Sequence, residues 1–127
     1  KILLGSNAMW EANRYSLLAG FVEPGESLEA AAVREVFEEA GVIVTEPEYV
    51  GSQPWPFPAS LMVGFKAKLS QDSINNIRPD GQEIVDLRWF SRADLLKNLG
   101  EIHLPGRPSI AHAMIQNWLG KPIPGSK

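Results

Sequence analysis

Hydrophobic and polar positions change period several times along this chain, and each change predicts an element. Short apolar runs separated by polar residues are consistent with an N-terminal hairpin formed by 2–5 and 15–19. β-Branched and apolar residues then predict short strands at 42–44 and 49–52. Alternation of apolar and polar residues predicts half-buried strands at 61–69 and 83–90.

Helical spacing of apolar residues predicts three helices, at 28–40, 92–99 and 109–119. In the first helix, Ser27 is the expected N-cap and Gly41 suits a left-handed C-terminal residue. The face of that helix expected to be buried carries Val33, Val36, Phe37 and Ala40. Strands outnumber helices and do not alternate regularly with them, which favours an α/β fold with a mixed sheet and helices on its faces.

Three glutamates occupy the opposite face of the first helix. Glu35, Glu38 and Glu39 are three and four residues apart, so a helix places their carboxylates within reach of a common point. Like charges at this spacing repel, so the acids are expected in water or against a cation. A solvated helix face is the ordinary interpretation of clustered glutamate, and the cluster alone does not exclude it.

The residues around these glutamates follow a fixed spacing of glycine, glutamate, arginine and apolar positions. The specified residues are Gly20, Glu26, Arg34, Glu35, Glu38, Glu39 and Gly41, with Val36 and Val42 apolar. At average residue usage such a match arises by chance ~10⁻⁹ of the time per start position. The stretch resembles the Nudix box, the signature of hydrolases acting on a nucleoside diphosphate linked to another group. The resemblance implies an α/β/α sandwich over residues 1–119, with 120–127 as a tail.

The Nudix resemblance also implies a site for divalent metal ions. Carboxylate and carbonyl oxygens are the ligands that Mg²⁺ prefers, and two or three Mg²⁺ or Mn²⁺ ions are expected. The implied ligands are the carbonyls of Ala19 or Gly20 and the side chains of Glu35, Glu38, Glu39 and Glu83. Glu38, Glu39 and Glu83 are the implied catalytic residues.

Glu83 is the one implied side-chain ligand that lies outside the box. It lies six residues before Trp89-Phe90, where the resemblance places a fourth acidic ligand. Asp80 and Asp86 are less well placed rivals, and a lone acid at a strand edge is more often simply solvated. Arg34 is expected to tie the preceding loop to the helix by pairing with one of the box carboxylates.

A second motif, SQPWPFPAS, covers residues 52–60. Three prolines in five positions fix φ and remove backbone donors, so they hold this segment extended. It could be an edge-strand loop with its aromatic side chains in the core, a proline-rich ligand for a partner domain, or a rigid platform on which a base stacks. Downstream of a Nudix box, it resembles the motif of the NADH pyrophosphatase subgroup.

This second resemblance implies a dinucleotide as the small-molecule substrate. The implied substrate-binding residues in the motif are Gln53, Pro54, Trp55, Pro56, Phe57, Pro58, Ala59 and Ser60. Phe21 is expected to stack on the nicotinamide, and Ala111 is expected to lie near the pocket.

The implied reaction is metal-dependent hydrolysis of the pyrophosphate of NADH or NAD⁺ to nicotinamide mononucleotide and AMP, with the 5′ end of NAD-capped RNA as a further substrate. Two alternatives stay open: hydrolysis of another nucleoside diphosphate derivative such as ADP-ribose, and a nucleotide-sensing module that binds without cleaving. An intact set of box acids argues against the sensing module.

Composition narrows the class of protein further. The chain has 127 residues, a net charge of −3 and no cysteine. The absence of cysteine excludes disulfides and thiolate zinc sites within these residues, so zinc is not expected here, and a reducing, cytoplasmic location is. Longer members of the subgroup carry an upstream zinc ribbon and form homodimers, so we expect this chain to be a C-terminal fragment. No apolar run is long enough to span a membrane.

Overall fold

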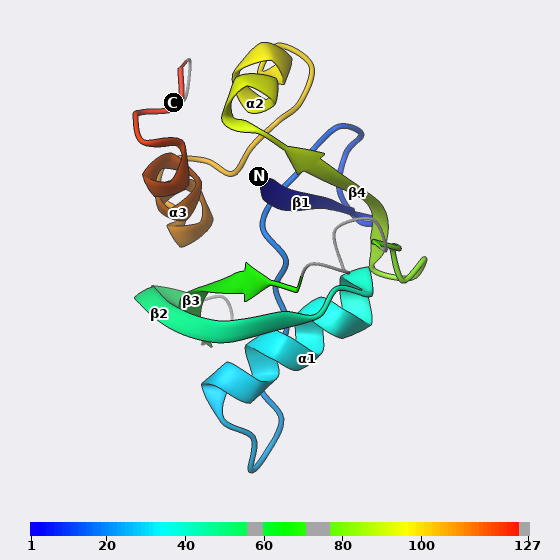
Figure 1. Cartoon of the computed structure of the whole chain (residues 1–127). Helices are drawn as coiled ribbons and strands as arrows, with labels where there is room; N and C mark the ends of the chain where they lie inside the picture. The colour runs from blue at the N-terminus through cyan, green and yellow to red at the C-terminus, as the bar shows by residue number, and fades with distance from the viewer. Residues whose placement is uncertain (56–59, 71–76, 125–127) are drawn as a thin grey trace.

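The computed structural model describes residues 1–55, 60–70 and 77–124, with only the backbone of Trp55. Along the chain the elements are β1 (Ile2–Asn7), α1 (Leu28–Ala40), β2 (Val44–Trp55), β3 (Ser60–Leu69), β4 (Ile84–Phe90), α2 (Arg92–Asn98) and α3 (Ile110–Leu119) (Figure 1). The three predicted helices and the strands at 61–69 and 83–90 are therefore present, with ends shifted by no more than one residue.

The described strands form two antiparallel pairs. β1 pairs with β4, with Ile2 opposite Phe90, and β2 pairs with β3 from Val44 opposite Leu69 to the far end of both strands. The expected α/β class is confirmed. The described residues do not form one mixed sheet, however, because each pair of strands stands as a separate two-stranded sheet.

Two predicted strands around residue 46 are one strand in the structure. β2 runs without interruption through the gap expected between 44 and 49, because a bulge in its pairing with β3 accommodates the irregular residues. Glu46 takes a left-handed φ of 51°, and Pro47, which has no N–H to donate, lies where the ladder is broken. The predicted N-terminal hairpin is reduced to a single antiparallel bridge between Gly5 and Ser16.

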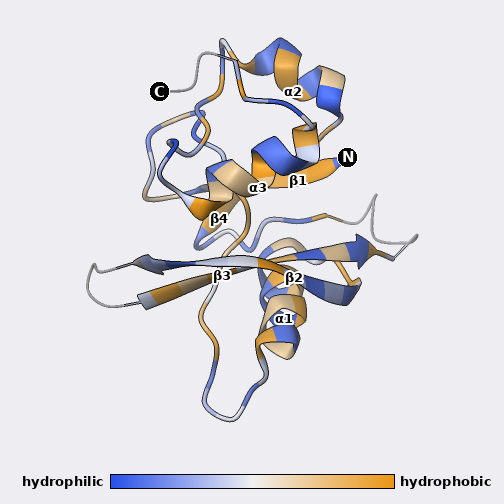
Figure 2. Cartoon of the chain, turned by 90° about the vertical axis from the view of Figure 1, so that its left-hand side faces the viewer, coloured by the Kyte–Doolittle hydropathy of each residue, from blue (hydrophilic) through white to orange (hydrophobic). Residues whose placement is uncertain are grey.

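The polypeptide is layered about these two sheets. α1 lies on one side of the β2–β3 pair, and the β1–β4 pair with α3 lies on the other side (Figures 1 and 2). Successive side chains of β1 point to opposite faces and pack into two different buried clusters. Leu4 packs with Phe90, Leu95 and other residues of one buried cluster, whereas Leu3 packs against a second cluster near the C-terminal end of α1.

Hydrogen bonds at the helix ends explain why the helices begin and end where they do. The hydroxyl of Ser27 accepts from the amide of Ala30 at 3.0 Å, and Gly41 ends α1 at a φ of 71°. At α2, Ser91 and Asp94 form a reciprocal capping box. None of the described helices is long and apolar enough to cross a membrane.

The segment after α3 is anchored through one residue. Ile123 is buried in the core cluster around Leu4, and its amide donates to the side chain of Gln116 at 2.9 Å. The part of the predicted 120–127 tail that the structure describes, up to residue 124, therefore packs against the domain.

Candidate functional site

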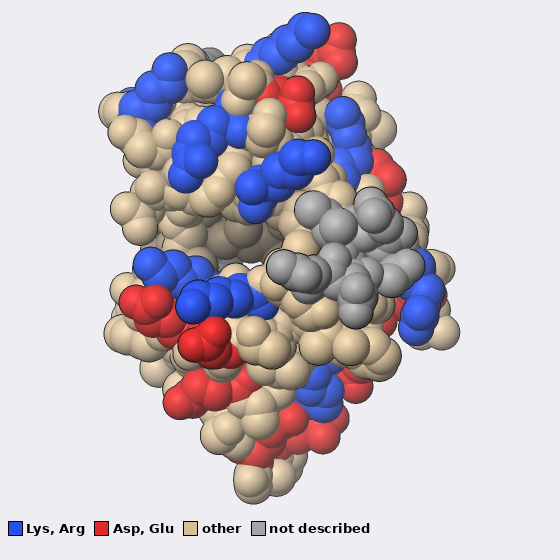
Figure 3. All heavy atoms as spheres, viewed as in Figure 1, with Lys and Arg blue, Asp and Glu red and all other residues tan. Residues whose placement is uncertain are grey.

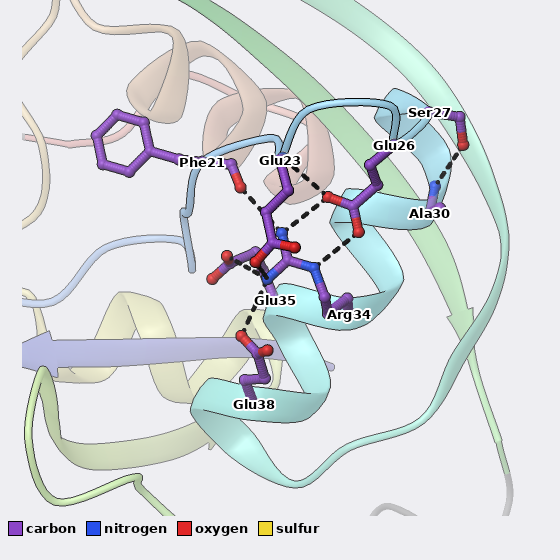
Figure 4. A network of polar contacts seen from close by, with 8 residues as sticks. All are labelled: Phe21, Glu23, Glu26, Ser27, Ala30, Arg34, Glu35 and Glu38. Carbon is purple, nitrogen blue, oxygen red and sulfur yellow. Dashed lines mark hydrogen bonds and ion pairs between the residues drawn. The ribbon is translucent and has the colours of Figure 1, made fainter.

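The loop before α1 is fastened to the helix by one guanidinium group. Arg34 donates from Nε and Nη2 to both carboxylate oxygens of Glu26, at 2.7 and 2.9 Å. It also donates to Glu35 at 2.7 Å, to Glu38 at 3.0 Å and to the carbonyl oxygen of Phe21 at 3.0 Å (Figure 4). Such bidentate, charge-assisted bonds are among the strongest polar contacts in proteins. The predicted structural role of Arg34 is confirmed, and the ion-pair network extends to three box carboxylates.

Gly20 and Glu35 lie directly against each other. A Cβ atom built on Gly20 would overlap the carboxylate of Glu35. The absence of a side chain at residue 20 therefore lets the helix carboxylate approach the backbone of the preceding loop. Two of the predicted metal ligands, one backbone group and one carboxylate, are brought together in this way.

The buried face of α1 differs from the face predicted by apolar spacing. Phe37 was expected in the core, but its side chain is 46% exposed, whereas Glu39 is only 3% exposed. The buried residues of α1 are Ala31, Glu39 and Ala40. We call Glu35, Glu38 and Glu39 the acidic ridge of α1. The helix is rotated so that this ridge is buried at Glu39 and exposed at Glu38. An acid in such a position loses most of its hydration.

Glu39 is an acid without a counter-charge. Its Oε2 atom is buried and has no hydrogen-bond partner among the described residues, and no Lys or Arg there forms an ion pair with it. Burial raises the pKa of Glu39 to about 7, with further contributions from the negative charges of Glu35, Glu83 and Asp80. The local field therefore has an excess of negative charge, which a bound cation would relieve.

The three acids considered for the fourth metal ligand have different surroundings. Asp80 accepts from the amides of Gln82, Glu83 and Ile84 at 2.9 to 3.0 Å, so it holds the turn before β4. Asp86 accepts from the Tyr15 hydroxyl. Neither a hydrogen bond nor an ion pair ties down the carboxylate of Glu83 within the described residues, and Glu83 lies near enough to Glu39 to raise its pKa.

The predicted metal ligands therefore lie in one region without meeting at one point. Of the described His, Asp and Glu side chains, no three converge closely enough to hold a metal ion, because the carboxylates of Glu35 and Glu38 are turned toward Arg34. In the view of Figure 3, several acidic side chains lie over the end of the molecule that holds α1, and others lie over the opposite end. Ala19 and Gly20 are both exposed in the adjoining loop.

The second motif begins inside the sheet. Gln53 and Pro54 belong to β2, and Ser60 begins β3 opposite Trp55. The side chain of Gln53 donates to the carbonyl oxygen of Pro108 and accepts from the amide of Ile110 at 2.8 Å. It therefore joins the motif to the start of α3. Pro56, Phe57, Pro58 and Ala59 lie outside the described residues, as does the side chain of Trp55.

Two further predicted substrate-binding residues flank this region. Phe21 follows Gly20 in the loop, and its ring is 83% exposed and points away from the Arg34 network (Figure 4). Ala111 is partly exposed, one residue after the amide that Gln53 contacts. The link between Gln53 and α3 thus places Ala111 beside the motif, whereas Phe21 lies next to the acidic ridge.

Two polar contacts that hold the site were not predicted from the sequence. The turn-forming role of Asp80 has a signal in the sequence, since Asp-Gly at 80–81 is a common turn pair. The contact between Gln53 and residues 108–110 has none, because it joins segments more than fifty residues apart.

Comparison with known families identifies the domain. A model of the NUDIX domain matches residues 1–113. This chain belongs to the Nudix family. The family prediction is therefore confirmed, and a divalent ion such as Mg²⁺ or Mn²⁺ is the typical cofactor of Nudix hydrolases.

Similar proteins of known name indicate to which subgroup of the Nudix family this chain is related. The chain is 44% identical to the "NAD-capped RNA hydrolase NudC" of Stutzerimonas stutzeri, over 98% of this chain and 43% of that protein. It is 42% identical to the protein of that name from Mycobacterium bovis, over 93% of this chain and 40% of that protein. It is 41% identical to human "NAD-capped RNA hydrolase NUDT12", over 94% of this chain and 26% of that protein. These names support the predicted subgroup, although the chain spans less than half the length of each relative.

Solved structures agree with the Nudix fold. A Nudix hydrolase from Nitrosomonas europaea superposes with a TM-score of 0.69 at 27% identity, covering 94% of this chain and 66% of that one. An Ap4A hydrolase from C. elegans superposes with a TM-score of 0.58 at 21% identity, covering 93% of this chain and 80% of that one, and this likeness shows the fold alone.

Proposed function

We propose that this Nudix domain hydrolyses the pyrophosphate of NADH or NAD⁺, producing nicotinamide mononucleotide and AMP with the help of divalent cations. The observation that carries the proposal is the 44% identity, over 98% of the chain, to a protein named as an NAD-capped RNA hydrolase. The buried carboxylate of Glu39 supports the metal-dependent part, because its Oε2 atom has no partner among the described residues and a divalent cation would supply the positive charge that this acid lacks.

The residues of the ridge suit a divalent cation. The unpartnered oxygen of Glu39, its raised pKa and its closeness to Glu35 and Glu83 describe a place where negative charge exceeds positive charge. We assign the metal ligands to the carbonyls of Ala19 or Gly20 and the carboxylates of Glu35, Glu38, Glu39 and Glu83, for two or three ions. Bound Mg²⁺ or Mn²⁺ supplies charge neutralisation at the phosphate oxygens and makes water more acidic.

The protein's own groups orient the reaction. Arg34 holds Glu35 and Glu38 in fixed positions relative to the loop. Glu38 and Glu83 have exposed side chains, and we assign to one of them the proton of the attacking water. That water adds to one phosphorus while the bond from this phosphorus to the bridging oxygen breaks. The two mononucleotides then separate.

The substrate's bases are assigned to the two flanking aromatic regions. Phe21 offers an exposed ring beside the acidic ridge, which suits stacking on the nicotinamide. The extended motif from Gln53 to Ser60, with Ala111 beside it, suits the rest of the dinucleotide. Because the relatives are named for capped RNA, the NAD-bearing 5′ end of RNA is proposed as a second substrate.

The test is the identity of the products. NADH incubated with the chain and Mg²⁺ in ¹⁸O-labelled water is expected to yield AMP and reduced nicotinamide mononucleotide, one of which carries the label, by mass spectrometry. Parallel reactions with ADP-ribose and 8-oxo-dGTP measure preference among nucleoside diphosphate derivatives. An intact dinucleotide with measurable binding would instead indicate a sensing module. Homodimerisation of a longer polypeptide and a cytoplasmic location stay predictions.

A further inference from the structure

The assigned metal ligands come from three segments that are far apart in the sequence. Glu35, Glu38 and Glu39 share α1, but the loop at 19–20 precedes that helix and Glu83 lies just before β4. A cation bound by all three segments requires a fixed spacing between them, because Mg²⁺ demands near-octahedral ligand geometry at short distances. Contacts that hold the loop in register with the start of β4 therefore bear on metal binding.

β1 lies between β4 and the segment 15–18, which leads into that loop. Gly5 of β1 is opposite Leu87 of β4. Gly5 also forms an antiparallel bridge with Ser16, through backbone hydrogen bonds of 2.9 and 3.0 Å. Neighbouring strands are about 4.8 Å apart, so the backbone of the segment lies about 10 Å from that of β4. A long side chain is needed to reach across.

On one face of β1 a tyrosine makes this connection. Continuing the antiparallel register from the bridge places Tyr15 opposite Ser6, and Ser6 is opposite Asp86. Ser6 is small, which leaves room for the Tyr15 ring, and the Tyr15 hydroxyl donates to the carboxylate of Asp86. Burial, and then this hydrogen bond, raises the pKa of Tyr15, so the hydroxyl stays protonated and able to donate.

On the opposite face the same two segments meet over Gly5. A Cβ atom built on Gly5 would lie 3.0 Å from the side chain of Leu18 and 3.5 Å from that of Ile84. Leu18 directly precedes Ala19, and Ile84 directly follows Glu83. This apolar contact brings the two segments together, but hydrophobic burial is non-directional and does not fix how one strand is placed along the other. A hydrogen bond is directional and does so.

We propose that the hydrogen bond from Tyr15 to Asp86 sets the spacing between the loop at 19–20 and Glu83, which makes Tyr15 a positioning residue for divalent cations. The inference rests on the proposed function, because that function assigns metal ligands to both places. Tyr15 is four residues before Ala19, and Asp86 is three residues after Glu83. A shift of either segment along β1 would therefore move an assigned ligand.

A role in folding alone predicts a different result. Removing a buried hydroxyl that donates a hydrogen bond lowers stability wherever it lies. It changes the metal affinity of the folded protein only if the hydrogen bond also positions the ligands, since groups outside the ligand set typically alter metal affinity by orienting the ligands. Metal affinity measured well below Tm therefore separates the two roles.

Tyr15→Phe tests the proposal, because it removes the hydroxyl and keeps the ring. The matched control is Tyr49→Phe, which removes a hydroxyl bonded to Ser52 at 3.1 Å from a ring that also packs edge to face on a phenylalanine. Mn²⁺ affinity is measured by titration calorimetry, at a temperature where circular dichroism shows each variant folded. Tyr15→Phe is expected to weaken binding roughly tenfold, whereas Tyr49→Phe should stay within about twofold.

Variants of Asp86 supply a second test that leaves the buried ring in place, because Asp86 is exposed. Asp86→Ala removes the acceptor and is expected to weaken Mn²⁺ binding as much as Tyr15→Phe. Asp86→Asn keeps an acceptor oxygen and should restore most of the affinity. The double variant Tyr15→Phe/Asp86→Ala should lose no more than either single variant, because both changes remove the same bond.

Two results would overturn the proposal on its own. Tyr15→Phe with a lower Tm but wild-type Mn²⁺ affinity would show that the hydroxyl serves the fold alone. Losses that multiply in the double variant would show that the two side chains act independently. A wild-type chain that binds no Mn²⁺ would overturn the proposal together with the assigned ligands. The expected losses of affinity without any hydrolysis of NADH would instead contradict only the proposed function.

Discussion

The acids around α1 form two groups with opposite surroundings. In the first group, Glu26, Glu35 and Glu38 share the guanidinium of Arg34. In contrast, Glu39 is buried beside Glu83 and Asp80, and no lysine or arginine of the described chain pairs with it. The acids that pair with Arg34 hold the loop against the helix. Glu39 has no such partner, so a bound cation would stabilise its negative charge most.

The pKa values of Glu26 and Glu39 express the same difference. Hydrogen bonds from Arg34, and then from the amide of Glu23, lower the pKa of Glu26 to about 2. Burial, and then the charge of Glu35, raises the pKa of Glu39 to about 7. Ionisation of Glu26 therefore favours the folded state, whereas ionisation of Glu39 opposes it until positive charge arrives. Carboxylates that are close in the sequence are therefore not equivalent in this structure.

Glu39→Gln should have the largest effect on turnover. Removing this carboxylate takes away a proposed metal ligand, so kcat for NADH is expected to fall at least about 10³-fold at any Mg²⁺ concentration. The measurement is the rate of AMP formation. The matched control is Glu29→Gln, which removes an exposed glutamate in the first turn of the same helix and should leave the rate within about twofold. Near-normal turnover in the Glu39→Gln variant would contradict the assigned role.

Arg34→Met should instead reduce stability most. Three carboxylates and the Phe21 carbonyl would lose their shared donor, so Tm is expected to fall by roughly 5–10 °C, measured by thermal unfolding. Arg14→Met breaks an exposed pair with Glu11 and should change Tm by no more than about 2 °C. Arg34→Lys keeps the charge but not the bidentate geometry, so it should fall between the two. Equal Tm values for the two methionine variants would show that the Arg34 network contributes no stability.

The stability of Glu39→Gln should depend on pH in a defined direction. The pKa of Glu39 is higher in the folded protein than its ordinary 4.5, so its stabilising contribution is complete below pH 4.5 and is lost as pH rises through about 7. Without metal, the variant should therefore match the wild type at pH 4.5 and exceed it by roughly 1–3 kcal/mol at pH 8. Urea unfolding with a chelator present measures this difference. A constant difference across that range would mean that Glu39 is not the titrating group.

Gly20→Ala should have the smallest effect on stability, and its main effect should be on the affinity for metal ions. The added Cβ would displace the flexible end of Glu35, so Tm should change by no more than about 3 °C, while the affinity for Mn²⁺ should fall on the order of tenfold. The matched control is Gly100→Ala, where a Cβ would meet open space. Metal affinity is measured by titration calorimetry, and an unchanged affinity would show that the approach of Glu35 to Gly20 plays no part in binding.

The helices could be predicted from local sequence signals. The extent of the strands could not, because it depends on pairing between distant residues. Ser27 and Gly41 at α1, and Ser91 at α2, act through neighbours within four residues, so their spacing in the sequence is sufficient. The continuity of β2 through Pro47 depends on its register with β3, which the sequence near Pro47 does not encode.

The site was predictable to the extent that it follows a fixed spacing. The link from Arg34 to Glu26 spans eight residues across a loop and helix turn, and the motif indicates it directly. The burial of Glu39 and the exposure of Phe37 depend on how α1 is rotated against β2, and the apolar spacing left that rotation undetermined by about one position.

The hydrogen bonds of Gln53 have an evolutionary consequence. Because this one side chain engages both Pro108 and Ile110, a change at residue 53 leaves two backbone groups without partners unless the turn before α3 changes at the same time. We therefore expect duplicated copies of this domain to change their substrate preference first by substitutions at Phe21 and Ala111, because these side chains form no hydrogen bonds that hold the fold.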